Sequence, residues 1–498
     1  MFKSFRLLSF ALTLFFWSGL LAQTRKSEAN PIIKKDLLLQ DLQILKKNLE
    51  VAQPGLYNYT SKQEMDLFFE NIKDSIVGDM HAIDFFRLIA PLSNKIRNGH
   101  TILVPPSKWE DHVITEEKLL PLDLYFYNDG LYVLHNLSNN PKIERGSVLK
   151  SINGKPANYL FGYVVDRWFK DGYNTTRPRE IAEEEFRFLY THFFNASNTY
   201  NVEFVDTHGQ RARLALEGIT EPEFQKRLKA RFNKDYVPWW RKNPEPLSLA
   251  VNKGIAHLKV TQFYNGLRSM EGMRFGKFIK DTFKRLNEER ITDLILDLRG
   301  NSGGNVEPQI ELLKHLISKP FHLYREVYAN VRKLPNPEYY EFGLLSKTAF
   351  RKNFSKEPIS GVYPMRSQIG FEEKPEPPSE NVFTGNLYVL IDGWSFSAAG
   401  EVCGVLKEHR KDAIFLGEET GGNPITNISG IQTFLTLPNS KSRILVCLVS
   451  YTTDVSYEND GFGVKPHITI RNSVFDVLEG KDRVLEKTNA LIFESRSQ

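Results

Sequence analysis

Two serines stand where a buried strand gives way to a helix of small residues. The strand LYVLID covers residues 387–392, Ser395 and Ser397 follow, and Ala398 opens the helix. A serine hydroxyl at such a turn can act as a nucleophile, with the next backbone amide facing the oxyanion that develops. The same position suits a serine that only caps the helix, and local sequence alone favours capping.

A glycine-rich turn follows another strand of the same kind. The segment DLRGNSGGN at residues 297–305 places Gly303 and Gly304 before a helix, where backbone N–H groups could face an anion. It lacks both the Gly-Lys-Ser/Thr of a P-loop and the spacing G-x-G-x-x-G. The turn is therefore a source of amide donors, not a nucleotide site.

A histidine stands at the corner between a helix and a strand. Gly99, in Asn-Gly-His-Thr, is predicted to be the left-handed residue that ends the helix, and His100 opens the short strand HTILV. An imidazole with a pKa near ~6.5 can accept a serine proton at neutral pH. The alternative, which local sequence alone favours, is a histidine that interacts with the helix dipole.

The elements that must position these residues fall into consecutive regions. Apolar residues at helical spacing predict a helical domain at 23–110, and short strands predict a β-rich module at 115–218. Residues 219–252 are typical of a polar linker. Strands and helices alternate over 253–480, which predicts a parallel sheet with helices on its faces. A charged, proline-rich insertion at 333–386 is expected to be a mobile cover or a surface strap.

The N-terminus has the pattern of a secretory signal peptide at residues 1–22. Lys3 and Arg6 precede an apolar run, and cleavage is expected near Ala22. A membrane span is the rival, but the run is short for a crossing of ~20 residues. We expect a periplasmic or secreted product with no membrane span once the signal is removed.

Composition narrows the classes of function. Of 498 residues, 41% are hydrophobic and 25% are charged, which is typical of a globular protein. Lys and Arg number 65 against 60 Asp and Glu, and the net charge of +5 gives no case for nucleic acid. The 11 histidines lack the spacing of a metal site, so neither a metal nor another cofactor is expected. Cys403 and Cys447 are expected to be buried free thiols rather than a disulfide.

Four motifs, taken in order, carry a resemblance. They are Asp-Leu-Arg-x-Asn-x-Gly-Gly at 297–304, Ser-Ala-Ala at 397–399, Gly-Glu-x-Thr-Gly-Gly at 417–422 and Gly-Val-x-Pro at 463–466. Together they resemble the tail-specific or C-terminal processing serine peptidases, over roughly residues 36–470. The resemblance implies a multidomain α/β fold: an N-terminal helical domain, a PDZ-like β-rich module and a C-terminal α/β catalytic domain with a ClpP/crotonase-like parallel sheet.

The resemblance also implies roles for the residues above. Ser397 matches the family's nucleophile, which leaves Ser395 as a structural alternative. The oxyanion hole would combine the backbone N–H of Ala398 with that of Gly303 or Gly304.

The expected general base distinguishes two branches of this family. One branch uses a lysine just after the Gly-Glu-x-Thr loop, but residues 421–424 read Gly-Gly-Asn-Pro. The branch similar to the tricorn core protease uses a histidine together with a glutamate from Glu-Asn-x-Gly, which match His100 and Glu458. Gly99 replaces the serine that links these two groups in the tricorn core, so Glu458 is expected to orient a water or a loop.

The β-rich module holds two further patterns. IERGSVLKSINGKPA, at residues 143–157, resembles part of a PDZ domain, although no Gly-Leu-Gly-Phe loop accompanies it. Ser147 and Lys150 match the Ser-x-x-Lys of penicillin-recognising enzymes, which requires a helix. Because the segment is predicted to be a strand, we interpret this match as coincidence.

The resemblance implies a secreted serine endopeptidase that acts on unfolded protein or on C-terminal peptide segments. The alternative is a non-catalytic protein that binds a peptide or hydrophobic ligand on the same fold, for which retinoid-binding proteins are the precedent. Retention of Ser397, His100 and the Gly-Gly turn together favours the enzyme. The sequence leaves the oligomeric state open.

Overall fold

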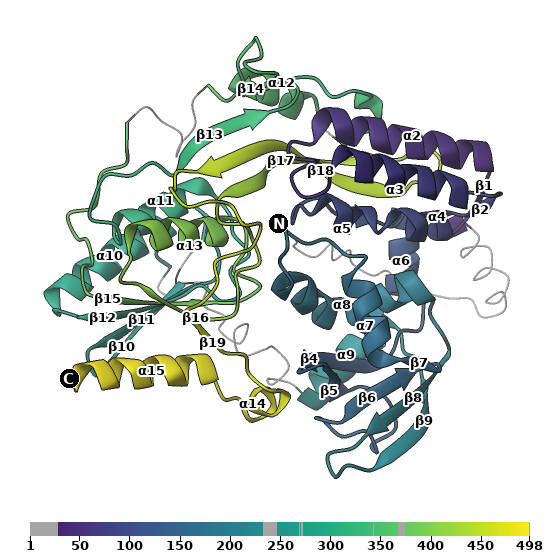
Figure 1. The fold of residues 1–498 in the computed structure, drawn as a ribbon. Helices are drawn as coiled ribbons and strands as arrows, with labels where there is room; N and C mark the ends of the chain where they lie inside the picture. Colours follow the sequence, from purple (N-terminus) through teal and green to yellow (C-terminus); the bar gives the residue numbers. More distant parts are fainter. Residues whose placement is uncertain are drawn as a thin grey trace.

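The structure is a computed structural model that describes residues 28–232, 247–267, 269, 272–341, 343–366 and 374–497. The predicted signal peptide lies outside these residues. The chain is a multidomain α/β protein in which helices and several separate sheets are combined (Figure 1). Within the described ranges, no helix is both long and apolar enough to pass through a bilayer.

The N-terminal region is helical, as predicted. Its helices are α2 (Lys35–Ala52), α3 (Lys62–Ser75), α4 (Ala82–Ile89), α5 (Leu92–Ile96) and α6 (Ser107–Thr115), and the strands β1 (Ile32–Ile33) and β2 (Met80–His81) pair beside them. The helix that was expected to end at Gly99 is split into α4 and α5 next to Pro91, which has no N–H to donate. The prediction for Gly99 was wrong, because Arg97 takes the left-handed conformation after α5, with φ 52°.

The β-rich module is an antiparallel sheet with two helices. Its strand order is β4-β5-β6-β8-β9, with β7 paired to β6. The bounds are β4 (Leu122–Tyr127), β5 (Gly130–Asn136), β6 (Val148–Ile152), β7 (Lys155–Pro156), β8 (Thr199–Val205), β9 (Arg211–Glu217), α7 (Ala157–Val165) and α8 (Thr176–Phe194). The helix α8 contacts β4 and α7, and its N-terminal end approaches the C-terminal region.

Much of the predicted linker is regular structure, so that interpretation needs correction. The helix α9 (Glu221–Phe232) buries Phe224 and Leu228 in a small apolar cluster, and β10 (Leu247–Asn252) is a sheet strand. The sequence EPEFQKRLKARF is polar enough to resemble a connector, but its few apolar residues lie on one face. Residues 233–246 lie outside the described residues.

The predicted parallel sheet is confirmed, with one antiparallel strand at its edge. The strand order is β10-β11-β12-β15-β16-β19, and only β10 is antiparallel to its neighbour. The bounds are β11 (Ile255–Val260), β12 (Asp293–Asp297), β15 (Asn386–Ile391), β16 (Ile414–Gly417) and β19 (Ile468–Thr469). The helices α10 (Phe275–Glu288), α11 (Val306–Lys314) and α13 (Ala398–His409) cover one face, and α15 (Arg483–Arg496), which follows α14 (Val474–Glu479), covers the other (Figure 1).

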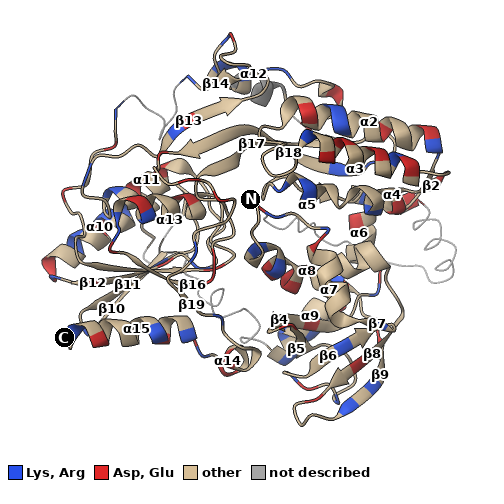
Figure 2. Ribbon diagram, viewed as in Figure 1, with Lys and Arg blue, Asp and Glu red and all other residues tan. Residues whose placement is uncertain are grey.

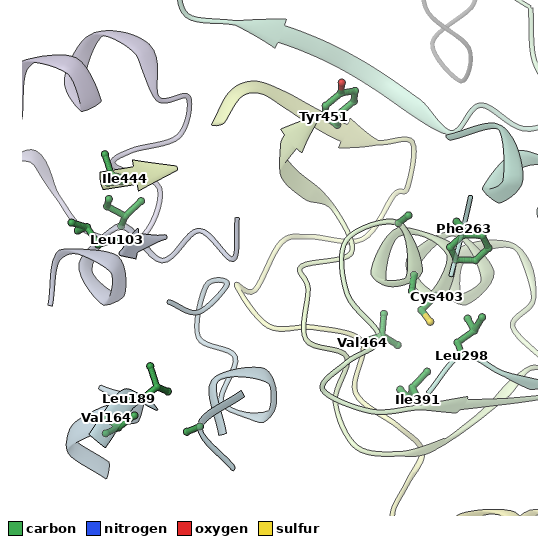
Figure 3. Packing of buried hydrophobic residues seen from close by; sticks show 14 of the residues in the cluster. Leu103, Val164, Leu189, Phe263, Leu298, Ile391, Cys403, Ile444, Tyr451 and Val464 are labelled. Carbon is green, nitrogen blue, oxygen red and sulfur yellow. The ribbon is translucent and has the colours of Figure 1, made fainter. Parts of the chain in front are cut away.

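A second, antiparallel sheet joins a strand of the N-terminal region to strands of the C-terminal region. It contains β13 (Tyr324–Ala329), β14 (Tyr363–Pro364), β17 (Thr426–Thr436) and β18 (Arg443–Thr453), and β3 (Leu103–Val104) pairs with β18. Leu103 lies opposite Ile444 in this pairing, and both side chains are buried (Figure 3). The strand that follows His100 is therefore part of a C-terminal sheet.

The predicted 333–386 insertion is packed where the structure describes it. It contains a short 3-10 helix (Pro337–Tyr339) and α12 (Leu344–Asn353), and β14 pairs with β13. Phe350, Phe354 and Met365 are buried. Cys403 and Cys447 are buried free thiols, as predicted. Charges of both signs alternate along the exposed helices, for example on α2 and α3 (Figure 2).

Candidate active site

The turn between β15 and α13 presents Ser397 in an unusual backbone conformation. Ser397 caps α13 with φ 55° and ψ −123°, which a residue with a Cβ rarely adopts. The Asp392 carboxylate holds the turn, because it accepts hydrogen bonds from the amides of Gly300, Trp394 and Ser395 at 3.0–3.1 Å. A strained residue fixed by its surroundings is typical of functional sites.

Ser395 has a different environment from Ser397. It is fully buried, its hydroxyl donates to Leu298 O at 2.9 Å, and it accepts from Asp392 N at 3.1 Å. Ser397 is only half-buried. The Ser395 hydroxyl therefore ties two loops together, whereas the Ser397 hydroxyl lies nearer the surface.

The glycine turn lies directly against Ser397. A Cβ on Gly303 would come within 2.7 Å of Ser397 Cβ, and one on Gly304 within 1.6 Å of Phe263 O. Both glycines also have positive φ, so no side chain fits at either position. Ala398 is the first residue of α13, where the amide has no intrahelical acceptor.

The His100 turn reaches the same place from the N-terminal region. Asn98 Oδ1 accepts from the amides of His100 at 2.7 Å and Thr101 at 3.1 Å, and Asn98 Nδ2 donates to Ile428 O at 3.2 Å. The His100 ring lies 4.4 Å from the ring of Phe396, centroid to centroid. The structure thus brings His100 next to the residue that precedes Ser397.

The surroundings of His100 keep its imidazole neutral. Burial, with a smaller contribution from the Arg177 charge, lowers the pKa of His100 to about 3. The Arg177 guanidinium lies 3.7 Å from the centroid of the Phe396 ring. A neutral imidazole at pH 7 is the form that a general base requires.

Asp171, which the sequence did not single out, connects the two turns. Its Oδ2 accepts from the amide of Asn423 at 2.8 Å, and its Oδ1 accepts from the amide of Gly99 at 3.4 Å. Burial raises the pKa of Asp171 to about 6 despite these bonds. No motif or spacing marks a lone aspartate in a loop, so sequence reasoning had no signal for it.

The structure does not bring Glu458 to His100 in the same way. Glu458 is exposed, whereas its neighbour Asn459 makes side-chain hydrogen bonds to Asn423 and Thr426. Asn459 Oδ1 accepts from Asn423 Nδ2 at 2.7 Å. The loop is therefore docked near Asp171 by Asn459.

Asn427 and Glu401 were also missed. Asn427 Nδ2 lies 3.4 Å from Ser397 Oγ and 2.7 Å from Glu401 Oε1, so both residues lie beneath the candidate nucleophile. Glu401 stands four residues after Ser397, in the first turn of α13, on the side of the helix that Ser397 caps. That spacing was a usable signal for Glu401, whereas Asn427 had none.

The Ser-x-x-Lys pair, Ser147 and Lys150, has no part in this arrangement. Ser147 is buried beside β6, and Lys150 is an exposed residue of that strand, so they do not share a helix face. Among the described residues, no cluster of three or more His, Cys, Asp or Glu side chains could hold a metal ion.

The family model for Peptidase family S41 matches residues 254–470. This part of the chain is a peptidase family S41 domain. The match spans the parallel sheet, the glycine turn and Ser397, so the chain is a serine peptidase, as its motifs predicted.

Most of the chain has a fold that is also found in known structures. Mature CPAF in complex with lactacystin has 14% identity and a TM-score of 0.61, covering 92% of this chain and 98% of that one. Mature CPAF has 14% identity and a TM-score of 0.57, covering 89% and 94%. The photosystem II D1 C-terminal processing protease has 13% identity and a TM-score of 0.39, covering 90% and 95%. No curated protein sequence matches the chain.

Proposed function

We propose that this S41 chain is a serine endopeptidase in which Ser397 is the nucleophile and His100 the general base. The observation that carries the proposal is the contact between the His100 ring and Phe396, which brings a neutral imidazole to the turn that presents Ser397. The match to Peptidase family S41 supports the serine chemistry. The position of Glu458 supports a role in its loop rather than a direct contact with His100.

In the proposed reaction, the Ser397 proton passes to His100 as Oγ bonds to the carbonyl carbon of the substrate. The oxyanion that forms accepts hydrogen bonds from the Ala398 amide and from the glycine turn. Gly303 N already donates to Asn301 Oδ1 at 2.9 Å, which favours the Gly304 amide as the second donor. The carbon–nitrogen bond then breaks, the amine takes the proton from His100, and water hydrolyses the acyl-enzyme by the reverse route.

A fluorophosphonate probe tests the nucleophile. The Ser397 oxygen should displace fluoride from phosphorus, and mass spectrometry should place the adduct on Ser397 alone. Ser397→Ala should remove labelling, and Ser395→Ala should retain it. An adduct on Ser395 or Ser147 would contradict the assignment, and a folded protein without an adduct would favour a binding protein on this fold.

We also propose that the chain is exported and acts on unfolded or C-terminal peptide segments. The basic and apolar pattern of residues 1–22 supports export. N-terminal sequencing of the protein recovered from the periplasm or medium should begin near residue 23. Cleavage of an unfolded protein but not of its folded form, measured side by side, tests the substrate class.

A further inference from the structure

A buried polar cluster lies beneath Ser397 and is not used by the mechanism above. We call it the Glu401 cluster. Its members are Glu401 on α13, Asn427 on β17, Tyr324 on β13 and Gln309 on α11, and each is at most 7% exposed. Four elements therefore converge on one carboxylate directly behind the candidate nucleophile.

The hydrogen bonds of the cluster converge on Glu401. Asn427 Nδ2 donates to Glu401 Oε1 at 2.7 Å, and the Tyr324 hydroxyl donates to Glu401 Oε2 at 2.9 Å. The nearby Gln309 side chain also favours the ionised form of Glu401 and so opposes a rise in its pKa. Buried carboxylates need such donors, because an unpaired buried charge is costly.

Asn427 has a second N–H to offer, and it points toward the nucleophile. The same Nδ2 atom lies 3.4 Å from Ser397 Oγ. This is long for a hydrogen bond in the free enzyme, but such contacts often shorten when charge develops on the oxygen. Because Asn427 donates to Oγ, the hydroxyl proton of Ser397 remains available for a base.

Hydrogen-bond partners rather than packing determine the orientation of the Asn427 amide, because its oxygen and nitrogen have nearly the same shape. If the amide rotated by 180°, its oxygen would face the Glu401 carboxylate, and two acceptors would be in contact. It would also face Ser397 Oγ as an acceptor and compete with His100 for the serine proton. The Glu401 carboxylate therefore selects the orientation that suits catalysis.

We propose that Glu401 is a positioning residue, which fixes the Asn427 amide with its N–H toward Ser397 Oγ so that the serine proton is directed to His100. The inference rests on the proposed function, because it assumes that Ser397 is the nucleophile. The adjacent residues Asn427 and Ile428 then contact both the nucleophile and the turn that carries the base. The side chain of Asn427 contacts Ser397, and the carbonyl of Ile428 anchors the His100 turn through Asn98.

The ionisation of Glu401 adds a second observable. Burial raises the pKa of Glu401, while the hydrogen bonds from Asn427 and Tyr324 and the nearby Gln309 side chain oppose that rise. The facing groups are Tyr324, with Tyr451 beside it, and two amides, and no cation among the described residues contributes to the pKa of Glu401. On protonation, Glu401 becomes a donor and permits the rotated Asn427 amide. Activity should therefore fall at low pH as Glu401 becomes protonated. We call this fall the acid limb of the pH profile.

Four variants test the proposal, with the second-order rate of fluorophosphonate labelling and kcat on a peptide as measurements. Glu401→Leu and Asn427→Ala should each slow labelling by ~10- to 100-fold, about one hydrogen bond to a charged group. Glu401→Gln should also slow labelling at pH 7, toward the rate of the parent at low pH, because its amide, like a protonated carboxyl, can donate to the oxygen of a rotated Asn427. Thr433→Val is the matched control: a buried hydroxyl on the same strand, outside the site.

The pH profile separates positioning from a merely structural role. Glu401→Gln should shift the acid limb to lower pH, and Thr433→Val should leave it unchanged. If Glu401→Leu fails to fold, the Glu401→Gln profile alone decides. Equal labelling rates for Asn427→Ala and the parent, or an unshifted limb in Glu401→Gln, would overturn the proposal while leaving Ser397 as the nucleophile. A parent protein that is folded but never labelled would overturn both.

Discussion

The ring of His100 lies 4.4 Å from the ring of Phe396, although almost 300 residues separate them in the chain. Phe396 immediately precedes Ser397, and the Arg177 guanidinium lies 3.7 Å from the centroid of the same ring. One aromatic side chain thus contacts both the candidate base and the cation that helps to keep it neutral. The candidate active site therefore lies where the N-terminal helical region meets the S41 domain.

His100→Ala should reduce turnover about as severely as Ser397→Ala, and the double variant should be little worse than either one. Members of one catalytic unit are strongly non-additive because each is useless without the other. Turnover of the three variants under single-turnover conditions gives the comparison. A folded His100→Ala protein with near-parental turnover would show that His100 only ends a turn.

The acid limb of the parent should not follow His100. The sequence alone predicts a limb near ~6.5, the pKa of an unperturbed imidazole. In the structure, burial and Arg177 lower the pKa of His100 to about 3, so the base stays deprotonated as the pH falls through 6. A profile of kcat/KM from pH 4 to 8 tests this, and a fall in parental activity near pH ~6.5 that Glu401→Gln and Asp171→Asn both leave unchanged would contradict it.

Lysine should play no part in proton transfer. Exchange of Lys407, Lys411 or Lys441 for Met, one at a time, should leave turnover within a few fold. Their amino groups have other partners: Lys407 Nζ lies 4.8 Å from the Tyr457 ring, Lys411 Nζ 3.8 Å from Glu408, and Lys441 Nζ 2.7 Å from Pro438 O. A loss of ~10³ at any of them in a folded protein would restore a serine–lysine mechanism.

Ser395→Ala should lower the stability of the fold but leave the nucleophile, Ser397, in place. Its hydroxyl bonds Leu298 O and Asp392 N in a buried position, so its removal should lower the free energy of unfolding by about 1–3 kcal/mol. Urea unfolding measures this, with the exposed Ser75→Ala as control. Unchanged stability would mean that the bond between the two loops contributes little.

Asp171→Asn should reduce turnover by roughly tenfold, because the uncharged side chain holds the Gly99 and Asn423 amides less strongly. Burial raises the pKa of Asp171 to about 6, above its value of ~3.9 in an unfolded chain. The folded protein therefore binds this proton more tightly, and the stability from Asp171 falls as the pH rises from 4 to 6.

Thermal unfolding of both proteins between pH 4 and 7 checks the assignment of this proton. The Tm of Asp171→Asn relative to that of the parent should rise over this range, because only the parent must ionise a buried carboxylate. A constant difference would show that Asp171 does not titrate there.

Local patterns in the sequence determined the elements of the S41 domain and the candidate nucleophile. Alternating strands and helices predicted β11, β12, β15 and β16, and a serine between a buried strand and a helix of small residues predicted the turn at Ser397. These signals are visible because strand and helix periods, and the need for glycine at Gly303 and Gly304, depend on neighbouring residues. In α9 the apolar residues are few, so its sequence alone indicates a polar linker and not a helix.

Only the tertiary structure decided which distant groups meet at Ser397. Asn98 and Ile428 are 330 residues apart, yet their hydrogen bond fixes the His100 turn to β17. Burial between elements gives Asp171, Asn427 and Glu401 their hydrogen-bond partners. The same burial raises the pKa values of the two carboxyl groups, Asp171 and Glu401. No spacing rule encodes such contacts, because burial and hydrogen-bond geometry arise only when the helical region, the β-rich module and the two C-terminal sheets pack together.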